Sequence, residues 1–198
     1  MPSTSLNTIV LSLLLAGTSV AADTFVRDDL ISEPRPSRFS ICYHGTCEDV
    51  TEVQLNDEQW RSIRLQFANN HSPQQERENI RRAIARLETM VGKITGTHVD
   101  KAMTLPHLGE EGQLDCIDES INTTFYLMMM ANDDLLRWHE VETRKTRGFF
   151  LFGWPHTTAV IRERQSGRKF AVDSWFLDNG EPPYILPLEQ WQDGWEPA

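Results

Sequence analysis

A pair of alternating segments in the C-terminal third of the chain constrains the fold most strongly. Residues 154–163 and 168–175 alternate apolar and polar side chains, and the Ser-Gly pair at 166–167 is typical of a tight turn. Together these segments predict an antiparallel β-hairpin. Residues 135–142 and 148–152 also have strand-like patterns, so we expect an antiparallel sheet over this part of the chain.

The length of the turn decides which side chains share a face of this hairpin. In a four-residue loop, Glu163 lies opposite Arg168 as an ion pair. His156 and Asp173 are then diagonal neighbours on one face, about 7–8 Å apart at Cβ, and a carboxylate can reach an imidazole over that distance. A three-residue loop with a bulge at Gly167 would place the two residues on opposite faces.

A helix is expected to carry Cys116 in its first turn. Asp115 is a good N-cap for an apolar-periodic stretch that continues to about Met130. The free backbone N–H groups and the positive helix end stabilise a thiolate there, whereas the negative charges of Asp115 and Asp118 raise the pKa of a thiol. The sequence does not decide which effect dominates, and a buried, inert Cys116 fits the composition as well.

Two N-cap patterns predict two helices further upstream. Residues 56–59 resemble a capping box, and residues 72–75 repeat the pattern with a proline at the first helical position. Apolar residues at helical spacing continue the second helix, and Gly92 can end it. Residues 93–113 contain several glycines and a proline, which is typical of a long loop. The tail over 178–198 is expected to wrap the surface with one short strand.

The first 22 residues resemble a secretory signal peptide. A short apolar run at 9–16 is followed by small residues at 18–22, where a signal peptidase would cut after Ala21 or Ala22. No later stretch approaches the length needed to span a bilayer. The mature chain is therefore expected to be soluble, in the periplasm or secreted.

Export would place the three cysteines in an oxidising compartment. Cys42 and Cys47 flank a His-Gly pair in residues 39–55, a segment that alternates enough to form a short hairpin. A glycine-centred turn can bring the two sulfurs together as a disulfide, which leaves Cys116 unpaired. A metal site from Cys42, His44 and Cys47 is the alternative, but no fourth ligand lies nearby in the sequence.

The length and charge of the chain limit the function classes. At 198 residues it suits one domain after the signal peptide, with an arm and helices over 23–100, a core over 110–176 and a tail over 177–198. The 29 acidic and 19 basic side chains give a net charge of −10, which argues against binding to nucleic acid or anionic lipid. The other histidines lack metal-ligand spacing, so no metal or cofactor is expected.

The order and spacing of Cys116, His156 and Asp173 resemble the transglutaminase-like superfamily of papain-like cysteine enzymes, in a bacterial exported form. That family has a cysteine at a helix start, a histidine at a strand start and an aspartate on the next strand. Here the histidine follows the cysteine by 40 residues, and the aspartate follows the histidine by 17. Cys-Ile-Asp at 116–118 resembles the family's Cys-x-Asp, and Asp-Ser-Trp at 173–175 resembles the Asn-Ser-Trp of papain-like proteases.

The resemblance implies a fold and a set of roles. The fold would be α+β with a papain-like core, in which the helix bearing Cys116 packs on an antiparallel sheet bearing His156 and Asp173. Cys116 would be the nucleophile, His156 would take its proton, and Asp173 would orient His156. The backbone N–H of Cys116 and the Gln113 side chain would stabilise an oxyanion, and Trp175 would shield the His–Asp contact. An amide of a peptide or of cell wall would form an acyl-thioester, which passes to water or to an amine.

Two departures from the family and two alternative functions accompany this hypothesis. Asp115 stands where the family has glycine, and Thr158 stands where it has an aromatic residue. A non-catalytic module on the same fold would bind a peptide or a partner, with His156 satisfied by a backbone carbonyl. A peptidoglycan amidase or endopeptidase is the other alternative, although such enzymes usually have a second histidine at the place of Asp173. The tryptophans that would line a substrate groove or pack in the core are Trp154, Trp175, Trp191 and Trp195.

Overall fold

A computed structural model describes residues 27–104, 110–148 and 155–198 of the chain. The predicted signal peptide over residues 1–22 lies outside these ranges, as do positions 149–152 of one predicted strand. None of the helices in the described ranges combines the length and the apolar character that crossing a membrane requires.

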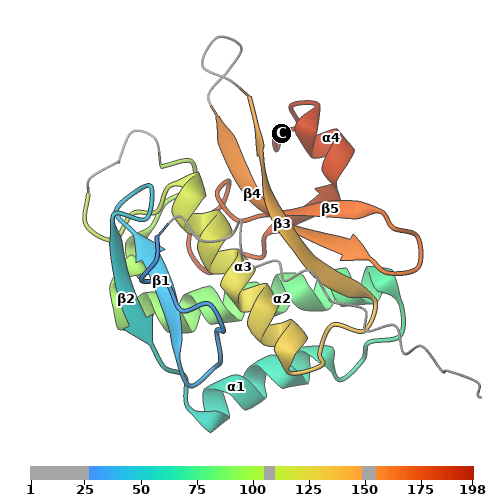
Figure 1. Cartoon of the computed structure of the whole chain (residues 1–198), viewed down its shortest axis with the longest axis horizontal. Coiled ribbons are helices and arrows are strands. Elements are labelled where there is room, and N and C mark those ends of the chain that lie inside the picture. The colour runs from blue at the N-terminus through green and yellow to red at the C-terminus, as the bar shows by residue number, and fades with distance from the viewer. Residues whose placement is uncertain (1–26, 105–109, 149–154) are drawn as a thin grey trace, which may run out of the picture.

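The described part of the chain is an α+β structure with two antiparallel sheets and four α-helices (Figure 1). The helices are α1 (Asp57–Arg64), α2 (Pro73–Thr95), α3 (Cys116–Asn132) and α4 (Leu188–Gln192). The strands are β1 (Phe39–Tyr43), β2 (Asp49–Val53), β3 (His139–Arg147), β4 (His156–Glu163), β5 (Lys169–Asp173) and β6 (Tyr184–Pro187). Strands β1 and β2 form the small sheet, and the large sheet has the order β3-β4-β5-β6.

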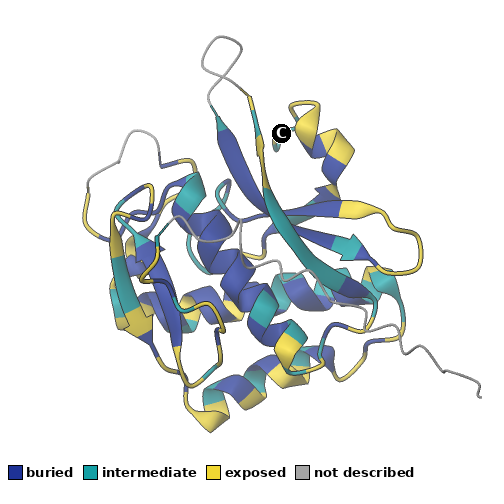
Figure 2. Ribbon diagram, in the orientation of Figure 1, coloured by how far each residue is buried: buried dark blue, intermediate teal, exposed yellow. Residues whose placement is uncertain are grey.

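Helix α3 forms the centre of the molecule. It runs between the two sheets, with β1 on one side and β3 and β4 on the other, and α2 also packs against it (Figure 1). Nearly its whole length is buried, as the dark ribbon in Figure 2 shows. The core draws on both sheets and three helices, and its fully buried members include Phe39, Ile63, Ile84, Leu127 and Ile161. The apolar area that these side chains remove from water is the main force holding α3 between the sheets.

The predicted N-caps begin α1 and α2. Asn56 and Gln59 form a reciprocal capping box, in which each side chain accepts a hydrogen bond from the other's backbone N–H. The Ser72 hydroxyl accepts a hydrogen bond from the backbone N–H of Gln75, and Pro73 is the first helical residue. Local sequence signals therefore place both helix starts correctly.

The predicted end of α2 at Gly92 is wrong. The helix continues to Thr95, and Gly96 ends it in the left-handed conformation with φ of 87°. Gly92 is needed for another reason, because a Cβ at this position would lie 2.8 Å from Asn179 Oδ1 and 2.9 Å from the backbone nitrogen of His98. The glycine thus allows a close approach of two later segments to the helix.

The hairpin of β4 and β5 has the register predicted for a four-residue loop. Ala159 lies opposite Val172, and the backbone N–H of Glu163 donates to the carbonyl of Arg168 at 2.8 Å. The side chains of Glu163 and Arg168 form the expected ion pair, with N···O of 3.7 Å. The two candidate site residues at the far end of the hairpin therefore share one face of the sheet.

Two other boundaries differ from the sequence-based expectation. The strand expected over 135–142 is shifted, since β3 spans His139–Arg147 and has an irregularity between Glu142 and Lys145. The C-terminal tail contains the single expected strand, β6, but this strand leads directly into α4, which the sequence pattern does not predict. Within the expected long loop, Thr97–Val99 form a short 3₁₀ helix.

Candidate active site

Cys116 is the first residue of α3, as predicted. The side chain of Asp115 caps the helix by accepting hydrogen bonds from the backbone N–H groups of Ile117 and Asp118, both at 2.9 Å. Asp118 completes a capping box by accepting from the backbone N–H of Asp115 at 3.2 Å. Two carboxyl groups therefore flank Cys116 at the helix start.

A disulfide-closed turn packs against these two carboxyl groups. Cys42 and Cys47 form the predicted disulfide, which takes up both sulfurs and so rules out the metal site weighed for them. The turn donates three backbone hydrogen bonds of 2.7 Å, from Gly45 and Cys47 to Asp118 and from Thr46 to Asp115. The four residues His44, Gly45, Thr46 and Cys47 all have positive φ, between 49° and 82°. This unusual backbone points successive N–H groups at the acids beside the candidate nucleophile.

His156 and Asp173 are in direct contact, as the hairpin register predicted. His156 Nε2 lies 2.7 Å from Asp173 Oδ2, and both side chains are buried, with relative exposures of 6% and 2% for the two residues. Asp173 also accepts the indole N–H of Trp191 on Oδ2 at 2.6 Å and the backbone N–H of Trp175 on Oδ1 at 3.3 Å. The carboxylate therefore has three donors, one of which is the imidazole.

Aromatic rings surround the His156 imidazole. Its centroid lies 4.7 Å from that of Trp175, 5.2 Å from that of Phe176 and 5.5 Å from that of Trp191. Trp175 therefore lies against the imidazole of the His–Asp pair, as its expected shielding role requires. The other ring nitrogen, Nδ1, is buried and has no hydrogen-bond partner in the part of the chain that the structure describes. Other buried atoms, Trp175 Nε1 among them, also lack a partner, so the basic character of this nitrogen is what makes it available to a reacting group.

The Cys116 sulfur lies against the backbone on both sides of His156. Its Sγ is 4.0 Å from the carbonyl oxygen of Pro155, and the backbone N–H of Thr157 also faces it. The side chain is half-buried, and it is the one free cysteine among the described residues. The helix start and the strand start thus bring the predicted nucleophile and base into one region.

The sequence does not decide whether Cys116 is a thiol or a thiolate, but burial in the structure favours the thiol. Burial raises the pKa of the Cys116 thiol to about 11, and the charges of Asp115 and Asp173 act in the same direction. The N–H of Thr157 lowers this pKa but does not compensate. The sulfur is therefore a neutral thiol at physiological pH, and the helix start does not create a stable thiolate.

Gln113, the predicted oxyanion donor, is engaged by the loop that precedes α3. Its side-chain oxygen accepts from the backbone N–H of Lys101 at 3.2 Å, and its amide nitrogen donates to the carbonyl of Val99 at 3.0 Å. Both ends of the amide therefore contact the loop, and the structure does not single out Gln113 as a donor to a substrate. The backbone N–H of Cys116 remains the natural candidate, since the first N–H groups of a helix have no intrahelical acceptor.

Three further acidic side chains, of which Glu119 belongs to α3 itself, are buried close enough to one another to interact electrostatically. Burial raises the pKa of Glu88 to about 8 and that of Asp100 to about 7. Burial and the neighbouring acids, Glu88 first, raise the pKa of Glu119 well above its ordinary value. No local sequence pattern predicts this group, because its members come from distant segments that only the fold brings together.

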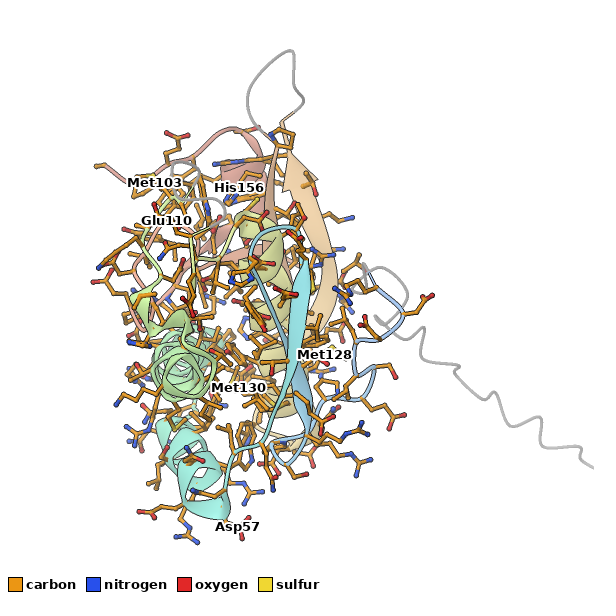
Figure 3. All side chains as sticks on the ribbon, turned by 90° about the vertical axis from the view of Figure 1, so that its left-hand side faces the viewer. Asp57, Met103, Glu110, Met128, Met130 and His156 are labelled. Carbon is orange, nitrogen blue, oxygen red and sulfur yellow. A yellow bond between two sulfur atoms is a disulfide. The ribbon has the colours of Figure 1, made fainter. Side chains whose placement is uncertain are left out.

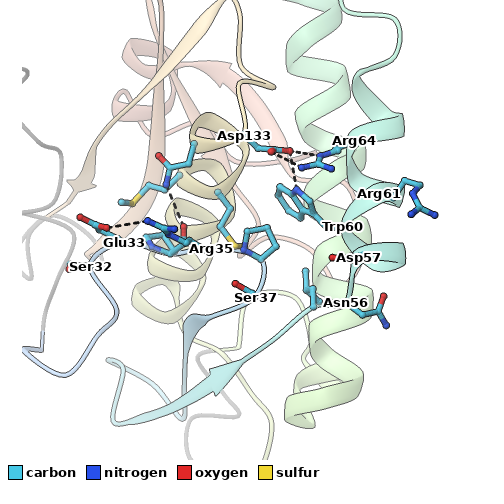
Figure 4. A pocket seen from close by; sticks show the side chains of 16 residues that line it. Ser32, Glu33, Arg35, Ser37, Asn56, Asp57, Trp60, Arg61, Arg64 and Asp133 are labelled. Carbon is cyan, nitrogen blue, oxygen red and sulfur yellow. Dashed lines mark hydrogen bonds and ion pairs between the residues drawn. The ribbon is translucent and has the colours of Figure 1, made fainter.

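A groove of about 1110 Å³ lies at the other end of α3 (Figure 4). Met129 on its wall follows Cys116 by 13 positions, which corresponds to roughly 20 Å along a helix. Figure 3 shows Met128 and Asp57, which also line the groove, well separated from His156. Its sixteen lining residues are Ser32, Glu33, Pro34, Arg35, Pro36, Ser37, Leu55, Asn56, Asp57, Trp60, Arg61, Arg64, Met128, Met129, Asn132 and Asp133. The groove and the Cys–His–Asp group are therefore separate features.

No group of three or more histidine, cysteine or acidic side chains in the described ranges could hold a metal ion. Comparison of the chain with protein-family models, curated proteins and solved structures gives no match. The function is therefore inferred from the geometry around Cys116, His156 and Asp173.

Proposed function

We propose that this chain is an exported cysteine-dependent acyl-transfer enzyme of transglutaminase-like type, acting on amide bonds of peptides or of cell wall. One observation carries the proposal. His156 donates Nε2–H to Asp173 at 2.7 Å, while its Nδ1 is buried and unpartnered among the described residues. The backbone on both sides of this histidine contacts the Cys116 sulfur. The free nitrogen is the acceptor that a reacting thiol needs.

The neutral state of the thiol determines how the first step proceeds. Because burial keeps the proton on Cys116, we expect Nδ1 of His156 to take that proton as the sulfur attacks the substrate carbonyl. A new C–S bond forms, and the carbonyl π electrons move to oxygen. Asp173 holds the imidazole in the tautomer with Nε2–H and stabilises the imidazolium that results.

The second half of the reaction returns the proton. The oxyanion accepts a hydrogen bond from the backbone N–H of Cys116 at the start of α3. As the C–N bond of the substrate breaks, His156 gives its proton to the leaving amine, and an acyl-thioester remains on Cys116. Water or a second amine then attacks the thioester and frees the thiol, so the net reaction is hydrolysis or acyl transfer.

An extracytoplasmic location supports the choice of substrate class. The signal-like residues 1–22 and the Cys42–Cys47 disulfide both favour an oxidising compartment. Cell-wall peptides and exported proteins are the amide substrates found there. The Asp173 carboxylate at the third position favours the transglutaminase-like type over an amidase with two histidines.

Acylation of the full chain by an activated ester tests the proposal. We expect p-nitrophenyl acetate to add one acetyl group to Cys116, as intact-mass and peptide analysis would show. Cys116→Ala should abolish this adduct, and His156→Ala should slow its formation roughly 100-fold or more. The matched control His71→Ala removes an exposed histidine and should acylate at the wild-type rate. Parallel digestion of purified peptidoglycan and of a casein–amine mixture then separates hydrolysis from transfer.

A non-catalytic binding module is the second candidate, and one observation favours it. A thiol whose pKa is raised to about 11 is a poor nucleophile unless a base assists it. Acylation of Cys116 no faster than that of free cysteine, with no change in His156→Ala, would establish the binding module instead of the enzyme.

A further inference from the structure

We propose that Trp191, on the C-terminal helix α4, is a positioning residue for the Cys116–His156–Asp173 site. The proposal rests on the function proposed above and extends the site beyond its three expected members. Its ring also lies beside the His156 imidazole, with centroids 5.5 Å apart, but the role proposed for it depends on its hydrogen bond to Asp173.

Trp191 and His156 share one oxygen of the carboxylate. The indole N–H donates to Asp173 Oδ2 at 2.6 Å, and His156 Nε2 lies 2.7 Å from the same atom. Both distances are in the range of hydrogen bonds to an ionised acceptor. The position of Oδ2 therefore sets the direction in which the imidazole can donate, and Trp191 sets the position of Oδ2.

Asp173 needs this second donor because its own strand does little to fix it. It is the last residue of β5, and among the described residues its other oxygen receives only the 3.3 Å hydrogen bond from the backbone of Trp175. A side chain at the end of a strand can otherwise change its rotamer and carry the imidazole with it. Two strong donors from different elements hold the carboxylate in one orientation.

An indole suits this role better than a charged side chain would. Its N–H is a neutral donor with no acceptor capacity, so it orients the carboxylate without neutralising its charge. The Arg147 guanidinium behind the ring also acts electrostatically on Asp173, but the hydrogen bond from Trp191 itself adds no positive charge, so the carboxylate can still stabilise the imidazolium of His156. An arginine or lysine in the same place would form an ion pair and weaken that effect.

Trp191 is itself held firmly. Its side chain has no exposed surface, and the guanidinium of Arg147 at the end of β3 stacks on the ring at 4.6 Å. Arg147 also donates a hydrogen bond to the backbone carbonyl of Trp191. The C-terminal tail is therefore part of the site, although the sequence places it outside the 110–176 core.

The first test compares two tryptophan variants of the full chain. Trp191→Phe keeps a buried ring but removes the N–H, and we expect it to slow acetylation of Cys116 roughly 10- to 100-fold. Trp60→Phe is the matched control, because the Trp60 indole N–H also donates to a carboxylate, that of Asp133 at 3.0 Å, but at the opposite end of α3 from Cys116. It should stay within about twofold of wild type. Equal rates for wild type and Trp191→Phe would overturn the role of Trp191 while leaving the proposed function intact.

A double-mutant cycle with Asp173→Asn separates positioning from packing. If Trp191 acts through Asp173, the double variant should acylate no more slowly than Asp173→Asn alone, and the pH profile of acylation should shift in Trp191→Phe. Additive losses in rate would show that Trp191 serves only the packing of the core, and would overturn the proposal.

A spectroscopic measurement keeps the proposal testable should Trp191→Phe fail to fold. In ¹⁵N-tryptophan-labelled protein, the indole N–H resonance of Trp191 should move more than any other indole resonance when Asp173 becomes Asn. An unmoved resonance would overturn the proposal. Should wild-type Cys116 never acylate, the proposed function fails while this resonance still reports the Trp191–Asp173 contact.

Discussion

Two histidine–carboxylate pairs in this molecule have nearly the same local description and very different surroundings. His139 begins β3 and contacts Glu76, with Nδ1 2.9 Å from Oε1. His156 begins β4 and contacts Asp173, with Nε2 2.7 Å from Oδ2. Both pairs are buried. The second nitrogen distinguishes them: that of His139 lies 3.1 Å from Arg77 Nη1, whereas that of His156 has no partner in the described ranges.

The two carboxylates differ in the same way. Glu76 accepts the backbone N–H groups of Arg137, Trp138 and His139 and the amide of Asn70, at distances from 2.6 to 2.9 Å. Burial opposes the charge, but these hydrogen bonds hold the pKa of Glu76 below its ordinary value. Glu76 therefore fastens the turn between α3 and β3 to α2.

The difference teaches that the free nitrogen of the imidazole, and not the residue type, separates the two pairs, although other buried atoms also lack a partner, among them Asn70 Oδ1 beside Glu76. Each polar atom of the His139 imidazole is satisfied inside the protein, so this pair contributes to the fold alone. A buried nitrogen without a partner costs about 1–3 kcal/mol. The protein retains that cost at His156, a residue whose neighbour in the chain, Pro155, contacts Cys116 through its carbonyl oxygen.

The largest expected effect comes from breaking the structural pair. Glu76→Ala leaves four donors without an acceptor, the backbone N–H groups of residues 137–139 and the His139 ring, and we expect the free energy of unfolding to fall by about 3–5 kcal/mol. Urea denaturation followed by circular dichroism measures this loss. Glu78→Ala, two positions along the same helix, removes only exposed ion pairs and should cost less than about 1 kcal/mol. Similar losses in the two variants would contradict the role given to Glu76.

The converse variant breaks the candidate catalytic pair. Asp173→Asn should leave unfolding within about 2 kcal/mol of wild type while slowing Cys116 acylation roughly 100-fold or more, because the amide no longer enforces the Nε2–H tautomer. Asp134→Asn is the control at an exposed, left-handed position that asparagine tolerates. An Asp173→Asn protein that unfolds as readily as Glu76→Ala and retains its rate would make the two pairs equivalent.

The buried acids Glu88, Asp100 and Glu119 differ from Glu76 in the direction of their pKa shift. Burial raises the pKa of each of the three, whereas hydrogen bonds lower that of Glu76. The pKa of Glu88 rises from 4.5 to about 8 on folding, so between these values the folded state binds a proton that the unfolded state has lost. Stability should therefore decrease as the pH rises from 4.5 to about 8, by up to about 1.4 kcal/mol per pH unit for each such proton. Glu88→Gln should flatten this slope in urea titrations across pH, and the exposed control Glu58→Gln should not. An unchanged slope in Glu88→Gln would show that Glu88 is ionised.

The smallest expected effect concerns the negative charge of Asp115 beside Cys116. Because the pKa of the thiol is about 11, alkylation by iodoacetamide should accelerate with pH throughout the range from 7 to 10. Asp115→Asn retains the helix cap but removes one negative charge, so the thiol pKa should fall and alkylation at pH 8 should rise roughly threefold. An alkylation rate that is constant above pH 7 would contradict the raised pKa.

Local signals in the sequence predicted much of the site. A four-residue loop, one of the two lengths that the sequence allows, predicts His156 and Asp173 on one face, and Asp115 marks the helix that begins with Cys116. The five-residue spacing of Cys42 and Cys47 likewise predicted their bond. Each of these features depends on residues that are close together in the chain.

The features that the sequence did not predict depend on contacts between distant segments. Helix α4 has five residues and no side-chain N-cap, so no local sequence signal predicts it. Trp191 contacts Asp173 because the C-terminal tail folds back over β5. The sequence predicts a helix end at Gly92, whereas the structure requires glycine there because Asn179 and His98 approach the helix too closely for a side chain. Residues so distant in the chain leave no local signal. The papain-like description of the core stays a prediction.

For a chain exported as proposed above, the turn closed by Cys42 and Cys47 would impose an order of maturation. Its three N–H groups compensate the acids that flank Cys116, and one covalent link holds them in a backbone shape that residues other than glycine seldom adopt. A newly made chain in a reducing cytosol lacks that link. We expect the surroundings of the thiol to be completed only after oxidation, so that the polypeptide reaches its destination before it becomes chemically competent.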